Sequence, residues 1–163
     1  LNSTAATADN TFFNDTAPTN AVFSIGTADV VNKDDRHYQF YAFASVKGFS
    51  KAGSYVGNGD ADGAFVHTGF KPAWVMIKRT DATNEWRIYD NKRASTFNPV
   101  GVRIKAESTA AESTAGAECD FLSNGIKIRS NSSGVNTSGG TYIYMTFAEH
   151  PFVSSEGVPV TAK

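Results

Sequence analysis

The sequence predicts an all-β fold, an antiparallel two-sheet sandwich of the jelly-roll or lectin-like kind. Short runs of aromatic and β-branched residues alternate with Asn, Ser, Thr and Gly, which favours strands joined by turns. Leucine, a strong helix former, occurs only at positions 1 and 122. The stretch 53–78 shows both signals, because closely spaced glycines precede an apolar run.

The apolar run 73–77 is expected to be a core strand, since both alternating sets of its side chains are apolar. Proline at 72 supports an extended entry, because it fixes its own φ and disfavours helix in the residue before it. Trp74 lies inside this run and is expected in the core. The glycine-rich turn before it should join this strand to another buried strand.

The other expected strands follow from aromatic runs and polar turns taken in chain order. Alternation in 86–90 places Trp86 on one face and Arg87 on the other. The segment 106–117 lacks an apolar stripe and is expected to be a loop or one loose helical turn. The expected strands outside 53–78 are 11–13, 21–25, 38–46, 86–90, 102–105, 121–122, 126–129 and 142–149.

Composition argues against several functional classes. The 163 residues carry a net charge of −1 with no long block of like charge, so a nucleic-acid partner is not expected. No apolar run approaches the length of a membrane span, so membrane insertion is not expected either. The single cysteine, Cys119, stands between two acidic residues and is expected to be a buried apolar side chain.

The chain contains an internal repeat with an offset of 104 residues. The offset aligns Val22 with Ile126, and Tyr38 with Tyr142. Residues 1–47 therefore match 105–151, which predicts three parts: the closing half of a preceding repeat at 1–47, a complete sandwich repeat at 48–152, and a tail at 153–163. A half-sandwich leaves strand edges and an apolar face uncovered, which should be covered by the complete repeat, by a neighbouring chain or by upstream sequence.

Several motifs resemble a family of uncharacterised domains in tail-fibre and related virion proteins of tailed bacteriophages. The resemblance covers about 45–152, and the first third resembles the end of the preceding copy in the tandem arrays of that family. The strings that carry it are GSYVGNG (53–59), TGFKPAWVMIKRTD (68–81), DFLSNG (120–125), GTYIYM (140–145) and FAEHPF (147–152).

The resemblance implies a virion structural protein at an extracellular tail appendage, which contributes to host-surface attachment and assembly. It implies homo-oligomers, contacts with other virion proteins and a host-surface glycan as a further partner. The family has no established catalytic residues to transfer, so an enzyme is not expected.

The loop Asn58, Asp60 and Asp62 has oxygen ligands at alternate positions before a glycine, which resembles the start of a calcium loop. The Glu expected at the twelfth position is absent, because Gly69 stands there. The alternative is a turn in which Asn and Asp side chains bond nearby amides, with no cofactor bound.

Trp86 is a candidate for stacking on a sugar ring, with Asn84 and Arg87 as polar neighbours at the mouth of a loop. A carbohydrate-binding module is therefore one alternative function. A glycan hydrolase or lyase on the same scaffold is another, since the separation of two carboxylates depends on the fold and not on local sequence.

Overall fold

The computed structural model describes residues 3–7, 11–93 and 97–151. The chain forms two compact units, one of Thr7–Phe43 and one of Leu1–Ala6 with Ala44–Lys163. The second unit holds every strand of the described residues. None of the described helices is long and apolar enough to cross a membrane.

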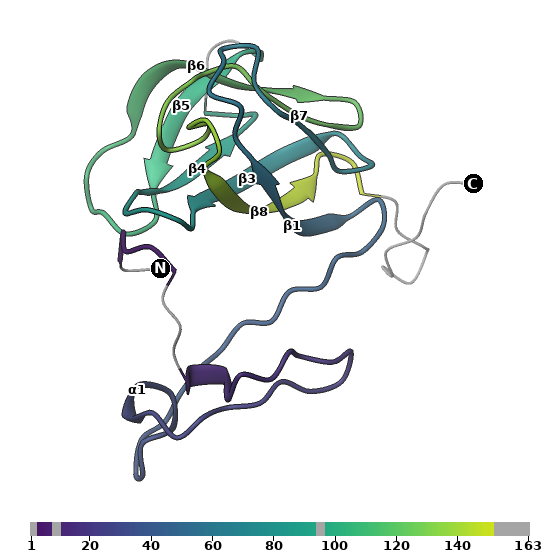
Figure 1. Cartoon of the computed structure of the whole chain (residues 1–163). Helices are drawn as coiled ribbons and strands as arrows, with labels where there is room; N and C mark the ends of the chain where they lie inside the picture. The colour runs from purple at the N-terminus through teal and green to yellow at the C-terminus, as the bar shows by residue number, and fades with distance from the viewer. Residues whose placement is uncertain (1–2, 8–10, 94–96, 152–163) are drawn as a thin grey trace. The chain divides into compact units, whose positions relative to one another are not determined.

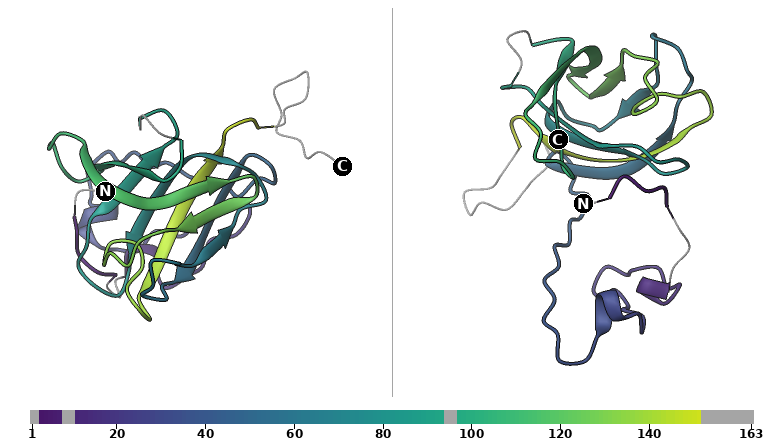
Figure 2. Two further views of the ribbon diagram at one scale, coloured as in Figure 1. Left: turned by 90° about the horizontal axis from the view of Figure 1, so that it is seen from above. Right: turned by 90° about the vertical axis from the view of Figure 1, so that its left-hand side faces the viewer.

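The larger unit is a single antiparallel sheet of eight strands that curls into a nearly closed barrel (Figures 1 and 2). This confirms the all-β class. In spatial order the strands are β1 (Ser50–Val56), β8 (Thr141–Ala148), β3 (Pro72–Arg79), β4 (Trp86–Asp90), β5 (Val100–Lys105), β6 (Ser113–Leu122), β7 (Gly125–Ile128) and β2 (Phe65–His67).

Strand β3 lies between β8 and β4, in agreement with its apolar character. Val75 and Ile77 point inward and are fully buried, while Met76 is largely covered on the outer face. Trp74 is not in the core as expected. It is half-buried on the outer face, where its ring packs on Phe147 with 5.6 Å between ring centroids, because its parity in the strand is that of Met76.

The barrel interior is filled by apolar side chains from seven of the strands and from the loop before β8. Full burial of each such side chain contributes about 1.5–3 kcal/mol. Tyr55 stacks on Tyr142 with 5.0 Å between centroids and 12° between ring planes. The buried cluster comprises Val66, Val75, Ile77, Tyr89, Val100, Cys119, Phe121, Ile126, Ile128, Val135, Tyr142 and Tyr144.

The Tyr142 hydroxyl fixes the turn that precedes β8. It accepts a hydrogen bond from the Thr137 N–H at 2.8 Å and donates one to the Ser133 carbonyl at 2.9 Å. The Tyr55 hydroxyl donates to the Val135 carbonyl at 2.7 Å. The hydroxyls of buried Tyr142 and half-buried Tyr55 therefore satisfy backbone groups that the turn leaves without a ladder partner.

Strand β6 corrects the expected loop at 106–117, because it begins at Ser113. Pairing with β5 explains the difference, since Arg103 lies opposite Ser113 and Val102 opposite Thr114. The β5–β6 register shifts between Val100 and Val102, beside Gly101. A Cβ on Gly101 would lie 1.8 Å from the Gly116 carbonyl oxygen, so only glycine fits this approach.

The unit Thr7–Phe43 contains no strand among its described residues, so the strands expected at 11–13, 21–25 and 38–46 are wrong. It has a 3₁₀ turn, η1 (Thr11–Phe13), and one helical turn, α1 (Asp29–Asn32). The rings of Phe23 and Phe40 pack edge to face, with 4.7 Å between ring centroids. The residue types favour strands, but a strand forms only where a neighbour completes its hydrogen bonds.

Candidate functional site

The outer face of the sheet is mainly apolar across β1, β8, β3 and β4. Residues that lie directly opposite each other on neighbouring strands point to the same face of the sheet. The register therefore aligns their outward-facing side chains in two rows that cross these four strands. A pocket of about 500 Å³ lies over these rows. Its lining residues are Ala52, Gly53, Ser54, Met76, Trp86, Ile143, Tyr144 and Met145.

Trp86 is the predicted site residue that lines this pocket. Its indole N–H donates to the Ser3 carbonyl at 3.0 Å, so its polar edge already has a partner. The Lys78 ammonium lies 6.0 Å from the ring centroid and also bonds the Thr4 carbonyl at 3.3 Å. The part of Trp86 that faces the pocket can therefore contribute apolar contact and stacking.

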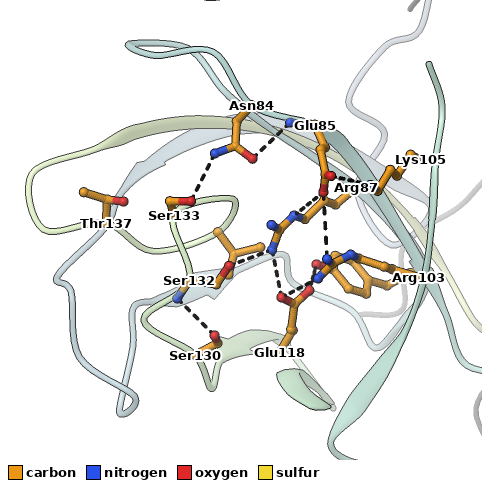
Figure 3. Close-up of polar contacts among 12 residues, drawn as sticks. Asn84, Glu85, Arg87, Arg103, Lys105, Glu118, Ser130, Ser132, Ser133 and Thr137 are labelled. Atoms are coloured by element: carbon orange, nitrogen blue, oxygen red, sulfur yellow. Dashed lines mark hydrogen bonds and ion pairs between the residues drawn. The ribbon is translucent and has the colours of Figure 1, made fainter. Parts of the chain in front are cut away.

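Asn84 does not line the pocket. Its side-chain amide donates to the Ser133 hydroxyl at 3.3 Å, and its side-chain oxygen accepts from the Glu85 N–H at 3.0 Å. Its own N–H donates to the Thr4 carbonyl at 2.8 Å. Asn84 therefore links the β3–β4 loop to the loop that precedes β8 (Figure 3).

Arg87 points into the barrel, away from Trp86, as their opposite parity in β4 requires. Its guanidinium donates to Glu118 at 2.8 Å and to the Ser132 hydroxyl at 2.9 Å (Figure 3). Only 7% of the Arg87 side chain and 3% of the Glu118 side chain are exposed. The structure therefore separates the proposed sugar-binding trio, because Arg87 cannot reach an outer-face ligand beside Trp86.

The Glu118 carboxylate is the centre of a buried polar network. It accepts from Arg87, from Arg103 at 2.7 Å and from the Tyr89 hydroxyl. Burial, with the Glu118 charge next, raises the pKa of Tyr89 well above its usual value, so the phenol stays a neutral donor. The network joins β4, β5 and β6 from inside.

A second carboxylate, Glu85, completes this set of charges. Glu85 forms ion pairs with Lys105, with Arg87 at 3.4 Å and with Arg103 at 3.8 Å. These partners lower the pKa of Glu85 despite the opposing effect of its partial burial. No local motif predicts this network, because its members become neighbours only through the registers of β4–β5 and β5–β6.

Gly134 is required for the network to close. A Cβ at this position would lie 2.0 Å from the Arg87 guanidinium carbon, so the loop before β8 lies directly on the arginine. The side chains that gather here are mutually paired, and they act as a structural clamp more readily than as a reacting site.

The Asn58–Asp62 loop is a self-bonded turn. The Asn58 side-chain oxygen accepts from the Asp60 N–H at 3.0 Å, and the Asp60 carboxylate accepts from the Asp62 N–H at 2.9 Å. The Asp62 carboxylate pairs with Lys127 at 2.8 Å, and the hydrogen bond from Lys127 lowers the pKa of Asp62.

These residues do not fit a calcium ion, because the ligand oxygens are committed to protein donors and a cation already pairs with Asp62. Across the described ranges, no group of three or more His, Cys, Asp or Glu side chains is placed to hold a metal. The Cys119 thiol is fully buried, which raises its pKa and keeps it protonated.

Replacement of the clamp arginine should destabilise the fold strongly. Arg87→Leu leaves the buried Glu118 charge short of one partner, and loss of a buried ion-pair partner costs about 3–5 kcal/mol. Chemical denaturation monitored by tryptophan fluorescence measures the change. Arg129→Leu is the matched control, because Arg129 pairs with Asp120 at a half-exposed position and should cost less than about 1 kcal/mol. Equal losses would contradict the clamp.

Asp81 should titrate abnormally because of Arg79. The guanidinium binds both carboxylate oxygens, at 2.8 and 3.1 Å. This contact lowers the Asp81 pKa from 3.8 to about 2. A depressed folded-state pKa contributes stability above pH 3.8 that is lost as the pH falls towards 2.

Arg79→Gln should raise the Asp81 pKa towards 3.8, as measured by a carboxyl NMR titration. Arg93→Gln is the control, since Arg93 pairs with Asp90. An unchanged Asp81 pKa in Arg79→Gln would exclude the assigned cause.

Comparison with known proteins gives one match. No curated protein and no solved structure matches the chain. The model of a family described as Domain of unknown function (DUF7483) matches residues 1–151, which include all described residues of both compact units. The chain belongs to the DUF7483 family.

Proposed function

We propose that this chain is a virion structural protein, a domain of a tail fibre or another tail appendage, and not an enzyme. In this proposal it lies outside the host cell, assembles with other copies of itself and with other virion proteins, and contributes to host-surface attachment. The motif resemblance over about 45–152 supports the virion setting.

The observation that carries the proposal is the division of chemistry between the two faces of the sheet. The clustered charges Arg87, Arg103 and Glu118 lie inside the barrel and bind one another. The outer face instead carries the apolar pocket beside Trp86. This arrangement suits a rigid scaffold whose outer surface makes contacts, since an apolar hollow favours binding and buried paired charges favour rigidity.

The finer fold assignment belongs to the same proposal. We infer that the curled sheet works as a two-layer sandwich of the jelly-roll or lectin-like kind. The register shift in β5 between Val100 and Val102 supports it, because an irregularity of this kind bends a strand where the sheet turns from one layer to the next. The core side chains then fill the space between the layers.

Immunogold electron microscopy tests the virion role. Antibodies against the purified chain should label the tail appendages of phage particles whose genome encodes it. Label restricted to the capsid, or found only in infected-cell extract and not on particles, would contradict the proposal.

Glycan binding is a second candidate, favoured by the position of Trp86 at the pocket. A glycan that stacks on the ring should bind at least about tenfold more weakly to Trp86→Ala, a loss of about 1.4 kcal/mol. Titration calorimetry with host-surface glycans measures the affinity. Trp74→Ala is the control, because Trp74 shares the outer face but does not line the pocket. Equal affinity of wild type and Trp86→Ala would exclude this site.

A further inference from the structure

The turn around α1 and the turn before β8 have the same backbone hydrogen bonds, 104 residues apart. The N–H groups of Val31 and Asn32 both donate to the Ala28 carbonyl, at 3.0 and 2.9 Å. The N–H groups of Val135 and Asn136 both donate to the Ser132 carbonyl, at 3.0 and 2.8 Å.

Each of the two turns is also closed by a tyrosine at the equivalent position. The Tyr38 hydroxyl accepts from the Lys33 N–H at 3.0 Å and donates to the Asp29 carbonyl at 2.7 Å. The Tyr142 hydroxyl makes the same two bonds with Thr137 and Ser133. Each of these residues differs from its counterpart by the offset of the sequence repeat, so the two turns are local structural equivalents.

The two tyrosines differ in what surrounds them. Tyr142 is fully buried and stacked on Tyr55 of β1, whereas 46% of Tyr38 is exposed. Two residues further on, Tyr144 is buried between β1 and β3, while 65% of its counterpart Phe40 is exposed. Strands β1 to β5 form the half of the barrel that covers Tyr142 and Tyr144. The described chain has no equivalent half that covers Tyr38 and Phe40.

The buried amide of Asn136 shows the same contrast. Its side-chain oxygen accepts from the Asn58 N–H at 2.9 Å, and its NH₂ group donates to the Asp60 carbonyl at 2.7 Å. Its counterpart Asn32 is exposed. Asn32 therefore presents a donor and an acceptor that match a turn like Asn58–Asp62.

We propose that residues 11–43 are the docking surface for a five-stranded half-domain of the β1–β5 type, which precedes residue 1 in the same polypeptide. The half-domain is placed before residue 1 because, in the complete copy, residues 48–104 come directly before the segment that is equivalent to 1–47. A second copy of this chain is a poorer occupant, because its β1 and β3 already pair with its own β8.

Two residue differences between the equivalent turns indicate what the docking half-domain must look like. At the positions equivalent to Ser132 and Gly134, the earlier turn has Ala28 and Val30. Val30 carries the Cβ that Arg87 excludes at Gly134, and Ala28 lacks the hydroxyl that binds Arg87. The half-domain that docks on residues 11–43 therefore lacks an arginine at the Arg87 position, while it keeps an aromatic ring at the Tyr55 position for Tyr38.

The test adds the missing half to the full chain. A copy of residues 48–104 that carries Arg87→Leu is joined directly before residue 1. Hydrogen exchange at 37–43, followed by mass spectrometry, should slow by at least about tenfold relative to the unfused chain, because these residues gain strand partners on both sides. The matched control is the same fusion with Val75→Asp and Ile77→Asp in the added copy only, which should give no slowing. Equal exchange in the two fusions would overturn the proposal.

Two further measurements separate docking from other causes. Asn32→Ala should speed exchange at 37–43 in the fusion and leave it unchanged in the unfused chain. Equal effects in both chains would overturn the assigned contact. Light scattering and hydrogen exchange of the unfused chain over a dilution series should show that exchange at 37–43 does not depend on self-association. A dimer in which 37–43 is already protected would overturn the proposal in favour of a second copy.

Discussion

The structure depends on the insertion of β8 between β1 and β3. This last strand pairs along most of its length with strands from early in the chain, so the barrel cannot close until the chain is almost complete. Long-range pairing of this kind has a high loop-closure cost. The interior tyrosines reduce the number of arrangements, because Tyr142 holds the preceding turn in place while its ring packs on Tyr55.

The charge network adds specificity to this closure. The buried pair of Arg87 and Glu118 has a desolvation cost, and apolar residues of the same volume could fill the space at similar free energy. Charges in a core instead penalise wrong registers, since a one-residue slip in β4 would move Arg87 to the outer face. The network therefore helps to select the fold, whereas the apolar pocket on the outer face is the surface to which the proposed function assigns contact with a partner.

Local pattern predicts much of the fold and less of the site. The apolar run in β3 and the alternation in β4 fix strand positions, because they depend on neighbours in sequence. The beginning of β6 at Ser113 could not be predicted, since Gly101 and the β5 pairing create it from a distance. For the same reason Trp86, Asn84 and Arg87 look like one site in sequence yet face the pocket, a loop and the interior respectively. Residues 11–43 show the converse, because strand-forming residue types without a partner strand do not form strands there.

Val30 has a consequence for how the chain avoids misfolding. Proteins with tandem similar segments are prone to exchange equivalent parts during folding, which traps them in misassembled states. Residues 7–43 are synthesised before 105–148 and resemble them, so they are natural competitors for the early strands. A Cβ in place of Gly134 would lie 2.0 Å from the Arg87 guanidinium carbon, so Val30 disfavours the earlier segment in the position of the turn before β8.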